Sequence, residues 1–203
     1  NNVNLGLSGG GLALTWSFVI DTTTISDNTA NTSGAGGDLR LLNGQTGTIR
    51  NTTISGNKAN SAGTPGGGGL FVRSGSSFTI ENSTISGNRT SASGGGVYLV
   101  LTSATSFARV ENSTIFGNAA GTDGTGSGAG VLFGGAIFDG AASATLTIAN
   151  TVVAGNTDTS GANDIVRTGV STLNTTFSLF QTTPAAGTTN GTDSNNITGV
   201  DPL

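Results

Sequence analysis

Four charged residues recur at one position of a repeated pattern and are the best candidates for acid–base chemistry in this chain. They are Asp21, Arg50, Glu81 and Glu111, with Arg109 two residues before the last of them. Two carboxylates about 5 Å apart can cleave a glycosidic bond, so Glu81 and Glu111 would suit that chemistry on neighbouring strands. However, the sign of the charge alternates over the first three members, as in an ion-pair ladder across a sheet. We therefore interpret the column as an outward charge ladder and predict no catalytic residue.

The composition narrows the chemistry further. The chain contains no His, Cys or Met, so the usual general base, thiol nucleophiles and disulfides are absent, as is the commonest metal ligand. Seven Lys and Arg residues against eleven Asp and Glu residues give a formal net charge of −4, which disfavours a nucleic-acid partner. A faint similarity to a Ca²⁺-binding repeat at Gly161–Asp164 does not recur. We predict neither a metal site nor a cofactor.

Asparagines recur at two positions of the pattern. The first set consists of Asn28, Asn57, Asn88, Asn118 and Asn156. Asparagine tolerates the backbone conformation of a bend, and its amide both donates and accepts, so a column of asparagines can bond from coil to coil. We predict that this first set is a buried structural ladder and not a set of ligands.

The second set of asparagines consists of Asn51, Asn82, Asn112 and Asn150. The first three members begin Asn-x-Ser/Thr sequons. We interpret these sequons as by-products of the repeat, with side chains too buried to be glycosylated. The better candidates for glycosylation are Asn31, Asn190 and Asn196.

A column of hydroxyl groups lies beside the second set. Its members are Thr24, Thr53, Thr84 and Thr114, and the next copy of the pattern has Val152 instead. A flat, outward array of this kind would be able to bind ice. Strand propensity and the need for small polar groups at a corner explain the column as part of the fold, and we favour that interpretation.

One phrase carries all of these columns and is clearest at Phe78–Asn88. Its ungapped copies are Phe18–Asn28, Gly47–Asn57, Ala108–Asn118 and Leu146–Asn156, and a worn copy runs over Val170–Phe180. Apolar and polar residues alternate within the phrase, as in a strand with one buried face, and glycine runs precede further apolar segments. The terminal asparagines are 29, 31, 30 and 38 residues apart. This period predicts an all-β parallel β-helix, a solenoid with three strands per coil and about six to seven coils of about 30 residues.

We expect a single domain over residues 1–203. Residues 1–17 are interpreted as the end of a preceding coil, residues 18–165 as regular coils, and residues 166–203 as a loosened last coil with a terminal segment. The longest spacing of the phrase contains a stretch rich in Gly, Thr, Ser and Ala. We predict an extended loop or a widened coil at Ala119–Ala136, and long loops on rigid scaffolds often carry recognition.

Two short phrases resemble the repeats of a known class of proteins. Gly134-Gly135-Ala136-Ile137 and Ile115-Phe116-Gly117-Asn118 resemble the Gly-Gly-Ala-Ile and Phe-x-x-Asn phrases of polymorphic outer-membrane-protein adhesins, with Ile in place of the leading Phe. Those phrases belong to the right-handed parallel β-helix repeat regions of bacterial secreted and surface proteins. The resemblance covers nearly the whole chain and implies a right-handed β-helix. Such repeats serve as scaffolds with many uses, so the function has to be argued from the residues.

These patterns predict an extracellular structural or adhesive β-helix without catalysis, a cell-surface or filament-forming protein whose units stack head to tail. The expected partners are a second copy or flanking segments of a longer protein, and then surface glycans or a neighbouring cell surface. No apolar run reaches the roughly 18 residues that a membrane span requires. The alternative is a carbohydrate-binding or polysaccharide-degrading β-helix, with its cleft on the charged face or in the 119–136 loop.

Overall fold

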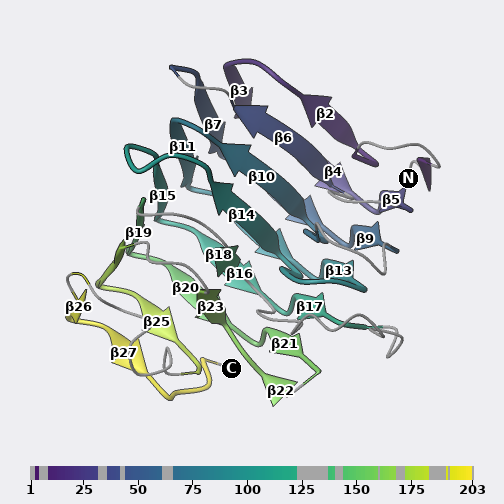
Figure 1. Cartoon of the computed structure of the whole chain (residues 1–203). Coiled ribbons are helices and arrows are strands. Elements are labelled where there is room, and N and C mark those ends of the chain that lie inside the picture. Colours follow the sequence, from purple (N-terminus) through teal and green to yellow (C-terminus); the bar gives the residue numbers. More distant parts are fainter. Residues whose placement is uncertain are drawn as a thin grey trace.

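The computed structural model describes residues 3–4, 9–31, 36–41, 44–60, 66–122, 137–139, 144–159, 161–167, 172–182, 191 and 193–202. All the regular structure in these ranges is β-strand. Strands from successive coils lie side by side in four sheets, so the chain winds repeatedly around one axis (Figure 1). The molecule is a β-solenoid. The described part of the chain contains no helix that is long and apolar enough to cross a membrane.

Each coil visits four sheets in a fixed order, which we call C, D, A and B. The strands of sheet C are β3 (Phe18–Asp21), β7 (Thr46–Arg50), β11 (Ser77–Glu81), β15 (Phe107–Glu111), β19 (Thr145–Ala149), β24 (Thr172–Thr176) and β26 (Asp193–Ser194). The strands of sheet D are β4 (Thr24–Ser26), β8 (Thr53–Ser55), β12 (Thr84–Ser86), β16 (Thr114–Phe116), β20 (Val152–Ala154), β25 (Leu179–Phe180) and β27 (Ile197–Thr198).

Sheets A and B complete the coil. Sheet A contains β1 (Val3–Asn4), β5 (Thr29–Ala30), β9 (Lys58–Ala59), β13 (Arg89–Thr90), β17 (Ala119–Ala120), β21 (Thr157–Asp158) and β22 (Gly161–Ala162). Sheet B contains β2 (Leu12–Leu14), β6 (Gly37–Leu41), β10 (Leu70–Ser74), β14 (Val97–Leu101), β18 (Ile137–Asp139) and β23 (Ile165–Arg167). All described strand pairs are parallel except β21 with β22.

The coils differ in two details from the sequence-based expectation. In addition to the three predicted strands, each regular coil has a two-residue strand in sheet A, directly after the terminal asparagine of the phrase. The expected count of six to seven coils was too high for the regular part, because the residues before β3 and after β18 form only partial or irregular coils. Four coils are complete and regular, and they begin at β3, β7, β11 and β15.

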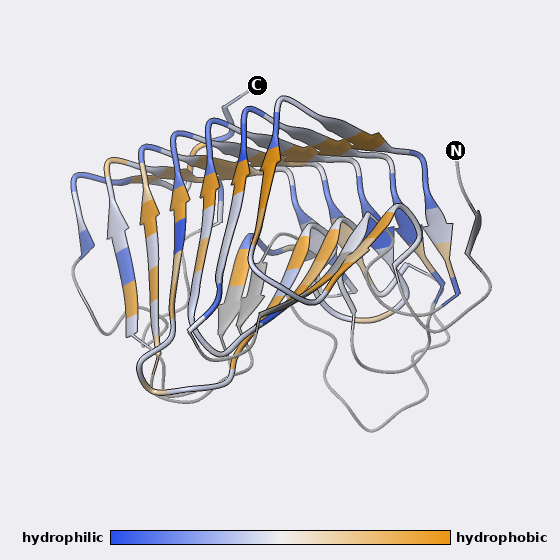
Figure 2. Ribbon diagram, turned by 90° about the horizontal axis from the view of Figure 1, so that it is seen from above, coloured by the Kyte–Doolittle hydropathy of each residue, from blue (hydrophilic) through white to orange (hydrophobic). Residues whose placement is uncertain are grey.

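The register of the sheets aligns the apolar residues of successive phrases. In sheet C, Ile80 is paired with Ile49 on one side and with Val110 on the other. In sheet D, Ile85 is paired in the same way with Ile54 and Ile115. These side chains are almost completely buried and form the centre of one continuous core. Hydrophobic residues accordingly recur at matching places of successive coils (Figure 2).

The worn copy of the phrase lies three residues later than the sequence analysis placed it. Leu146 is paired with Leu173, not with Val170, and Val153 is paired with Phe180. The expected alignment was wrong because this copy keeps only part of the alternation that defines the phrase. In the observed register, Phe180 fills the core position that isoleucine or valine occupies in earlier coils.

Two bends in each coil use the left-handed backbone region. Between sheets C and D, the φ angles of Thr22, Asn51, Asn82, Asn112, Asn150, Phe177 and Asn195 are 48° to 57°. Between sheets D and A, φ is 56° at Asp27 and 62° to 66° at the glycines that precede the later terminal asparagines. Asparagine and glycine enter this region at low cost, which explains why the repeat places them there.

The glycine runs before sheet B allow close contact between coils. A Cβ atom on Gly36 would clash with the carbonyl oxygen of Gly69 and lie 3.1 Å from Nδ2 of Asn57. The equivalent atom on Gly69 would meet the carbonyl of Gly96 and Nδ2 of Asn88. Only glycine leaves room here for both the next coil and the asparagine side chains.

Candidate functional site

Five asparagines form a continuous ladder inside the bend between sheets D and A. The members are Asn28, Asn57, Asn88, Asn118 and Asn156, and all are buried. In the first four, the backbone N–H and the side-chain Nδ2 both donate to Oδ1 of the asparagine in the next coil, at 2.9–3.0 Å. From Asn57 onward, Nδ2 also donates to an isoleucine carbonyl of the preceding coil, at 2.9–3.1 Å. Hydrogen bonds between coils therefore occupy the side-chain amides of the inner members.

The ladder ends on a buried carboxyl group. Nδ2 of Asn156 donates to Oδ1 of Asp164 at 3.0 Å, and Asp164 is only 1% exposed. The backbone N–H of Thr182 donates to Oδ2 of Asp164 at 2.8 Å, and the N–H of Asp164 donates to the Thr182 hydroxyl at 2.9 Å. The antiparallel strands β21 and β22 turn the chain back just before this residue. The sequence analysis saw Asp164 only as part of a faint calcium motif.

A second ladder, made of hydroxyl groups, was missed. It runs through Thr23, Thr52, Ser83, Ser113, Thr151 and Ser178, directly after the bend between sheets C and D. In the first five members the backbone N–H donates to the hydroxyl oxygen of the next coil, as from Thr52 to Ser83 at 3.2 Å, and the N–H of Ser178 donates to Oδ1 of Asn196 at 2.9 Å. Each hydroxyl in turn donates to the carbonyl two residues earlier, at 2.7–2.9 Å. The signal in the sequence was the unbroken run of Ser and Thr beside the sequon asparagines.

The second set of asparagines corrects an expectation. Asn51, Asn82, Asn112 and Asn150 are all exposed, so the prediction that the sequon side chains are too buried for glycosylation was wrong. Their left-handed backbone turns the side chain away from the core, whereas continued strand alternation would have turned it inward. Of the three asparagines predicted as better glycosylation candidates, Asn31 is exposed, Asn196 is half-buried, and Asn190 lies outside the described residues.

The charge column faces outward on sheet C but is not a continuous ladder. Both Nε and Nη2 of Arg50 lie 2.9 Å from Oδ2 of Asp21, and Nδ2 of Asn51 donates to Oδ1 of the same carboxylate at 3.0 Å. The hydrogen bond from Asn51, followed by that from Arg50, lowers the pKa of Asp21 below its ordinary value. Nη1 of Arg109 lies 3.2 Å from Oε1 of Glu111. Glu81 forms no ion pair with any residue that the structure describes.

Glu81 and Glu111 are register partners on β11 and β15, as the glycosidase interpretation requires. They stand on the outer surface of sheet C. Neither residue lines the hollow at the N-terminal end of the stack or the hollow over the last coils of sheet D. No group of three or more potential metal-ligating side chains occurs among the described residues. The arrangement offers a partly exposed carboxylate pair.

The threonine column lies on the outer face of sheet D. Thr24, Thr53, Thr84 and Thr114 are in register, and the same position continues as Val152, Leu179 and Ile197. The outer face of this sheet therefore changes from hydroxyl groups to apolar side chains towards the C-terminal coils.

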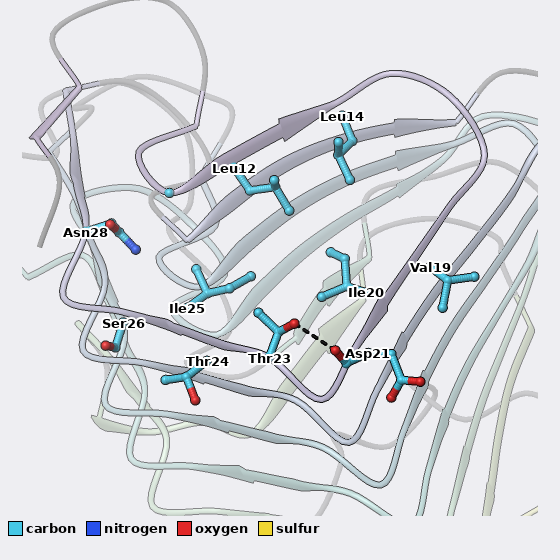
Figure 3. Close-up of a pocket in the computed structure, with 11 residues that line it drawn as sticks. Leu12, Leu14, Val19, Ile20, Asp21, Thr23, Thr24, Ile25, Ser26 and Asn28 are labelled. Atoms are coloured by element: carbon cyan, nitrogen blue, oxygen red, sulfur yellow. Dashed lines mark hydrogen bonds between the residues drawn. The ribbon is translucent and has the colours of Figure 1, made fainter.

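An open groove lies at the N-terminal end of the stack. Leu12, Leu14, Ile20 and Ile25 point towards one another across it from β2, β3 and β4 (Figure 3). We call it the N-terminal groove; its volume is about 800 Å³, and Val19, Thr23 and Asn28 also line it. No described strand pairs with the outer edges of β2, β3 and β4. No described residue donates a hydrogen bond to Oδ1 of Asn28, which receives no bond like those of the later asparagines.

A second hollow lies over the last coils of sheet D. Phe177, Val152, Leu179 and Ile197 line it together with the amides of Asn150 and Asn195, and its volume is about 360 Å³. We call it the Phe177 groove. Phe177 is 64% exposed and occupies a left-handed bend position that holds asparagine in the coils on either side.

The comparison with protein families supplies the class of the molecule. A model described as a right-handed β-helix region matches residues 5–198. The chain belongs to the right-handed β-helix family. This family contains both non-catalytic and polysaccharide-degrading members, so membership assigns no reaction to the chain. No curated protein and no solved structure matched the chain in the corresponding searches.

One predicted recognition element of this β-helix lies mostly outside the described residues. Of the 119–136 loop, the structure describes only residues 119–122. The remaining candidates for function are the N-terminal groove, the charged face of sheet C and the Phe177 groove.

Proposed function

We propose that the chain is a non-catalytic structural segment of an extracellular or cell-surface protein, in which β-helical units associate end to end. The observation that carries the proposal is the state of the N-terminal groove. There apolar side chains line an open groove, the edges of three strands pair with no described strand, and no described residue donates to the Oδ1 atom of Asn28.

The chemistry of this end fits another coil of the same repeat. A coil stacked on it would donate backbone hydrogen bonds to the strand edges and place apolar side chains against Leu14 and Ile20. A terminal asparagine in a flanking coil of the repeat would donate two hydrogen bonds to Asn28, as Asn57 does to Asn88, whereas in a second copy of this chain Asn156 is already bonded to Asp164. Exposed strand edges recruit further strands, and a contact between two unlike ends propagates as a filament unless it closes into a ring.

The use of polar groups supports a scaffold. The two ladders consume the buried amides and hydroxyls in bonds between coils, and no described side-chain polar atom is buried without a partner. The sequence contains no Cys or Met, which suits an extracellular setting where both would be open to oxidation.

The test is association in solution. Sedimentation velocity over a range of concentrations, followed by electron microscopy, should show oligomers that grow along the solenoid axis. Val19→Lys, which places a charge on the edge strand β3, should prevent this growth. Phe107→Lys is the matched control, because Phe107 is also exposed on sheet C but lies in its middle. A wild-type chain that stays monomeric at millimolar concentration, or equal effects of the two variants, would overturn the proposal.

A catalytic role has one observation in its favour, the register pair of Glu81 and Glu111. Under the proposed function, neutral and acidic polysaccharides should remain uncleaved in a reducing-sugar assay. Turnover that disappears in Glu81→Gln but persists in the control variant Thr79→Ala would establish the enzymatic alternative instead.

A further inference from the structure

The Phe177 groove interrupts the pattern of the repeat at one point on the surface. At the bend between sheets C and D, Asn150, Phe177 and Asn195 occupy the same position in three successive coils. The backbone N–H of Asn150 donates to Thr176, and that of Phe177 donates to Ser194, so the bends stack like those of the earlier coils. The exposed ring of Phe177 therefore lies between two exposed amides, with a spacing of about 4.8 Å per coil.

The position of Phe177 is unfavourable for the fold on its own. A bulky residue with φ of 49° is a conformational outlier, and a ring that is 64% exposed gains little from burial. Asparagine serves this bend in the coils on both sides. An unfavourable backbone that carries an exposed aromatic ring is the kind of outlier from which a functional role is inferred.

The floor of the groove changes in the same coils. The outward position of sheet D, which holds threonine from β4 to β16, holds Val152, Leu179 and Ile197 in β20, β25 and β27. Ile197 is 56% exposed. The result is an apolar strip beside an aromatic ring, edged by the exposed side chains of Asn150 and Asn195.

The residues that line the groove indicate which class of ligand it can bind. None of the described residues that line the groove is charged, which disfavours phosphates, sulfated chains and uronic acids. A flat apolar ring with adjacent amides suits a pyranose, which has an apolar C–H face and hydroxyl groups at its edge. The lining residues present the outer face of sheet D, and only Ile197 belongs to the edge strand β27, so most of the groove offers a peptide no backbone pairing.

We propose that the Phe177 groove binds a neutral oligosaccharide, with one sugar ring stacked on Phe177 and hydroxyl groups bonded to Asn150 and Asn195. The site deepens the proposed surface role, on which it rests for its biological setting. At about 360 Å³ the groove accommodates one or two sugar rings, so weak binding in the range of about 0.1–1 mM is expected for a single site.

The experiment uses the whole chain with four uncharged probes, namely cellohexaose, maltohexaose, mannohexaose and chitohexaose, and with hexagalacturonate as the charged comparison. Binding is measured by isothermal titration calorimetry and by saturation-transfer NMR. At least one neutral probe should bind, and hexagalacturonate should not. Phe177→Tyr should retain binding, while Phe177→Asn, which restores the residue of the neighbouring coils, should weaken it about tenfold or more.

Phe107→Asn is the matched control, because it removes another exposed phenylalanine from sheet C and should leave binding unchanged. Circular dichroism of each variant verifies the fold. The proposal is overturned if no neutral probe binds, if Phe177→Asn binds as well as the wild type, or if hexagalacturonate binds equally well. It is also overturned if Phe177→Asn abolishes a dimer while no sugar binds, because a second copy would then be the occupant. End-to-end association, measured with Val19→Lys on the same preparations, separates failure of this site from failure of the proposed function.

Discussion

Asn57 donates both its backbone N–H and its side-chain Nδ2 to the single oxygen Oδ1 of Asn88, at 3.0 and 2.9 Å. Asn88 repeats the arrangement towards Asn118. The side chain of Asn88 therefore bonds four polar groups belonging to the two neighbouring coils, and the asparagines of the ladder are buried. Removing one member leaves buried polar groups unpaired. The free-energy cost of this exceeds the modest net gain of a typical hydrogen bond.

Asn88→Ala should destabilise the fold by about 1–3 kcal/mol, because it removes the acceptor of the backbone N–H of Asn57 and one hydrogen bond each from Nδ2 of Asn57, Oδ1 of Asn118 and the carbonyl of Ile54. Urea unfolding followed by circular dichroism measures the effect. Asn82→Gly is the control, since Asn82 is exposed and glycine also accepts the left-handed backbone. Equal stability of the Asn88 variant and the wild type would show that the ladder does not hold the coils together.

Asp164→Asn should destabilise the C-terminal end of the ladder by about 1–3 kcal/mol. The carboxyl group accepts from Nδ2 of Asn156 and from the N–H of Thr182, and an amide would present a donor to one of them. Hydrogen exchange of the amides in β20 and β25 reports the local loss. Asp158→Asn provides the comparison, because Asp158 is more exposed. A larger effect from that comparison variant would contradict the role assigned to Asp164.

Asn51→Gly should raise the pKa of Asp21 towards its ordinary value, because it removes the hydrogen bond that lowers this pKa most. Folding lowers the pKa of Asp21, so the carboxylate stabilises the fold above the ordinary carboxyl pKa of about 3.9. That contribution disappears as the pH falls through the lowered value. NMR titration of the Asp21 carboxyl carbon tests the shift. Asn82→Gly should leave the titration unchanged, and a similar shift in both variants would refute the assignment to Asn51.

Phe177→Asn should stabilise the fold by about 1 kcal/mol, because asparagine adopts the left-handed bend at lower cost than phenylalanine. The reciprocal change Asn150→Phe should destabilise it by a similar amount. Thermal unfolding of the two variants gives the comparison. If Phe177→Asn melts below the wild type, packing of the ring outweighs the backbone cost, and the ring has a structural explanation.

The regular part of the fold could be predicted because its signal is repeated. Ile80 and Ile85 were placed in the core by their alternation and by identical residues in other copies, and Asn88 was placed in a ladder by its constant position. The bend at Asn82 was misread because alternation continued through it would bury the side chain. The left-handed backbone reverses that direction, and a pattern of residue types does not contain it.

The less regular features could not be predicted from the sequence for a different reason. Asp164 enters the ladder only because β21 and β22 fold back on each other, which breaks the period that the sequence analysis relied on. The hydroxyl ladder through Ser83 was visible as a run of small polar residues, but strand propensity explained that run equally well. Phe177 was assigned to the wrong position because its copy of the phrase is degraded.

The asparagine ladder also gives the solenoid an electrical direction. In every inner member the oxygen of the amide points towards the N-terminal coils and the nitrogen towards the C-terminal coils, so the amide dipoles are aligned along the axis and polarise one another. Their negative end is the oxygen of Asn28 in the N-terminal groove, and their positive end meets the carboxyl oxygens of Asp164. Because Asp164 accepts from the last asparagine, two units joined end to end would not share one continuous ladder, and two N-terminal ends facing each other would oppose like partial charges. The interior of the molecule thereby disfavours a contact between two N-terminal ends in the proposed association.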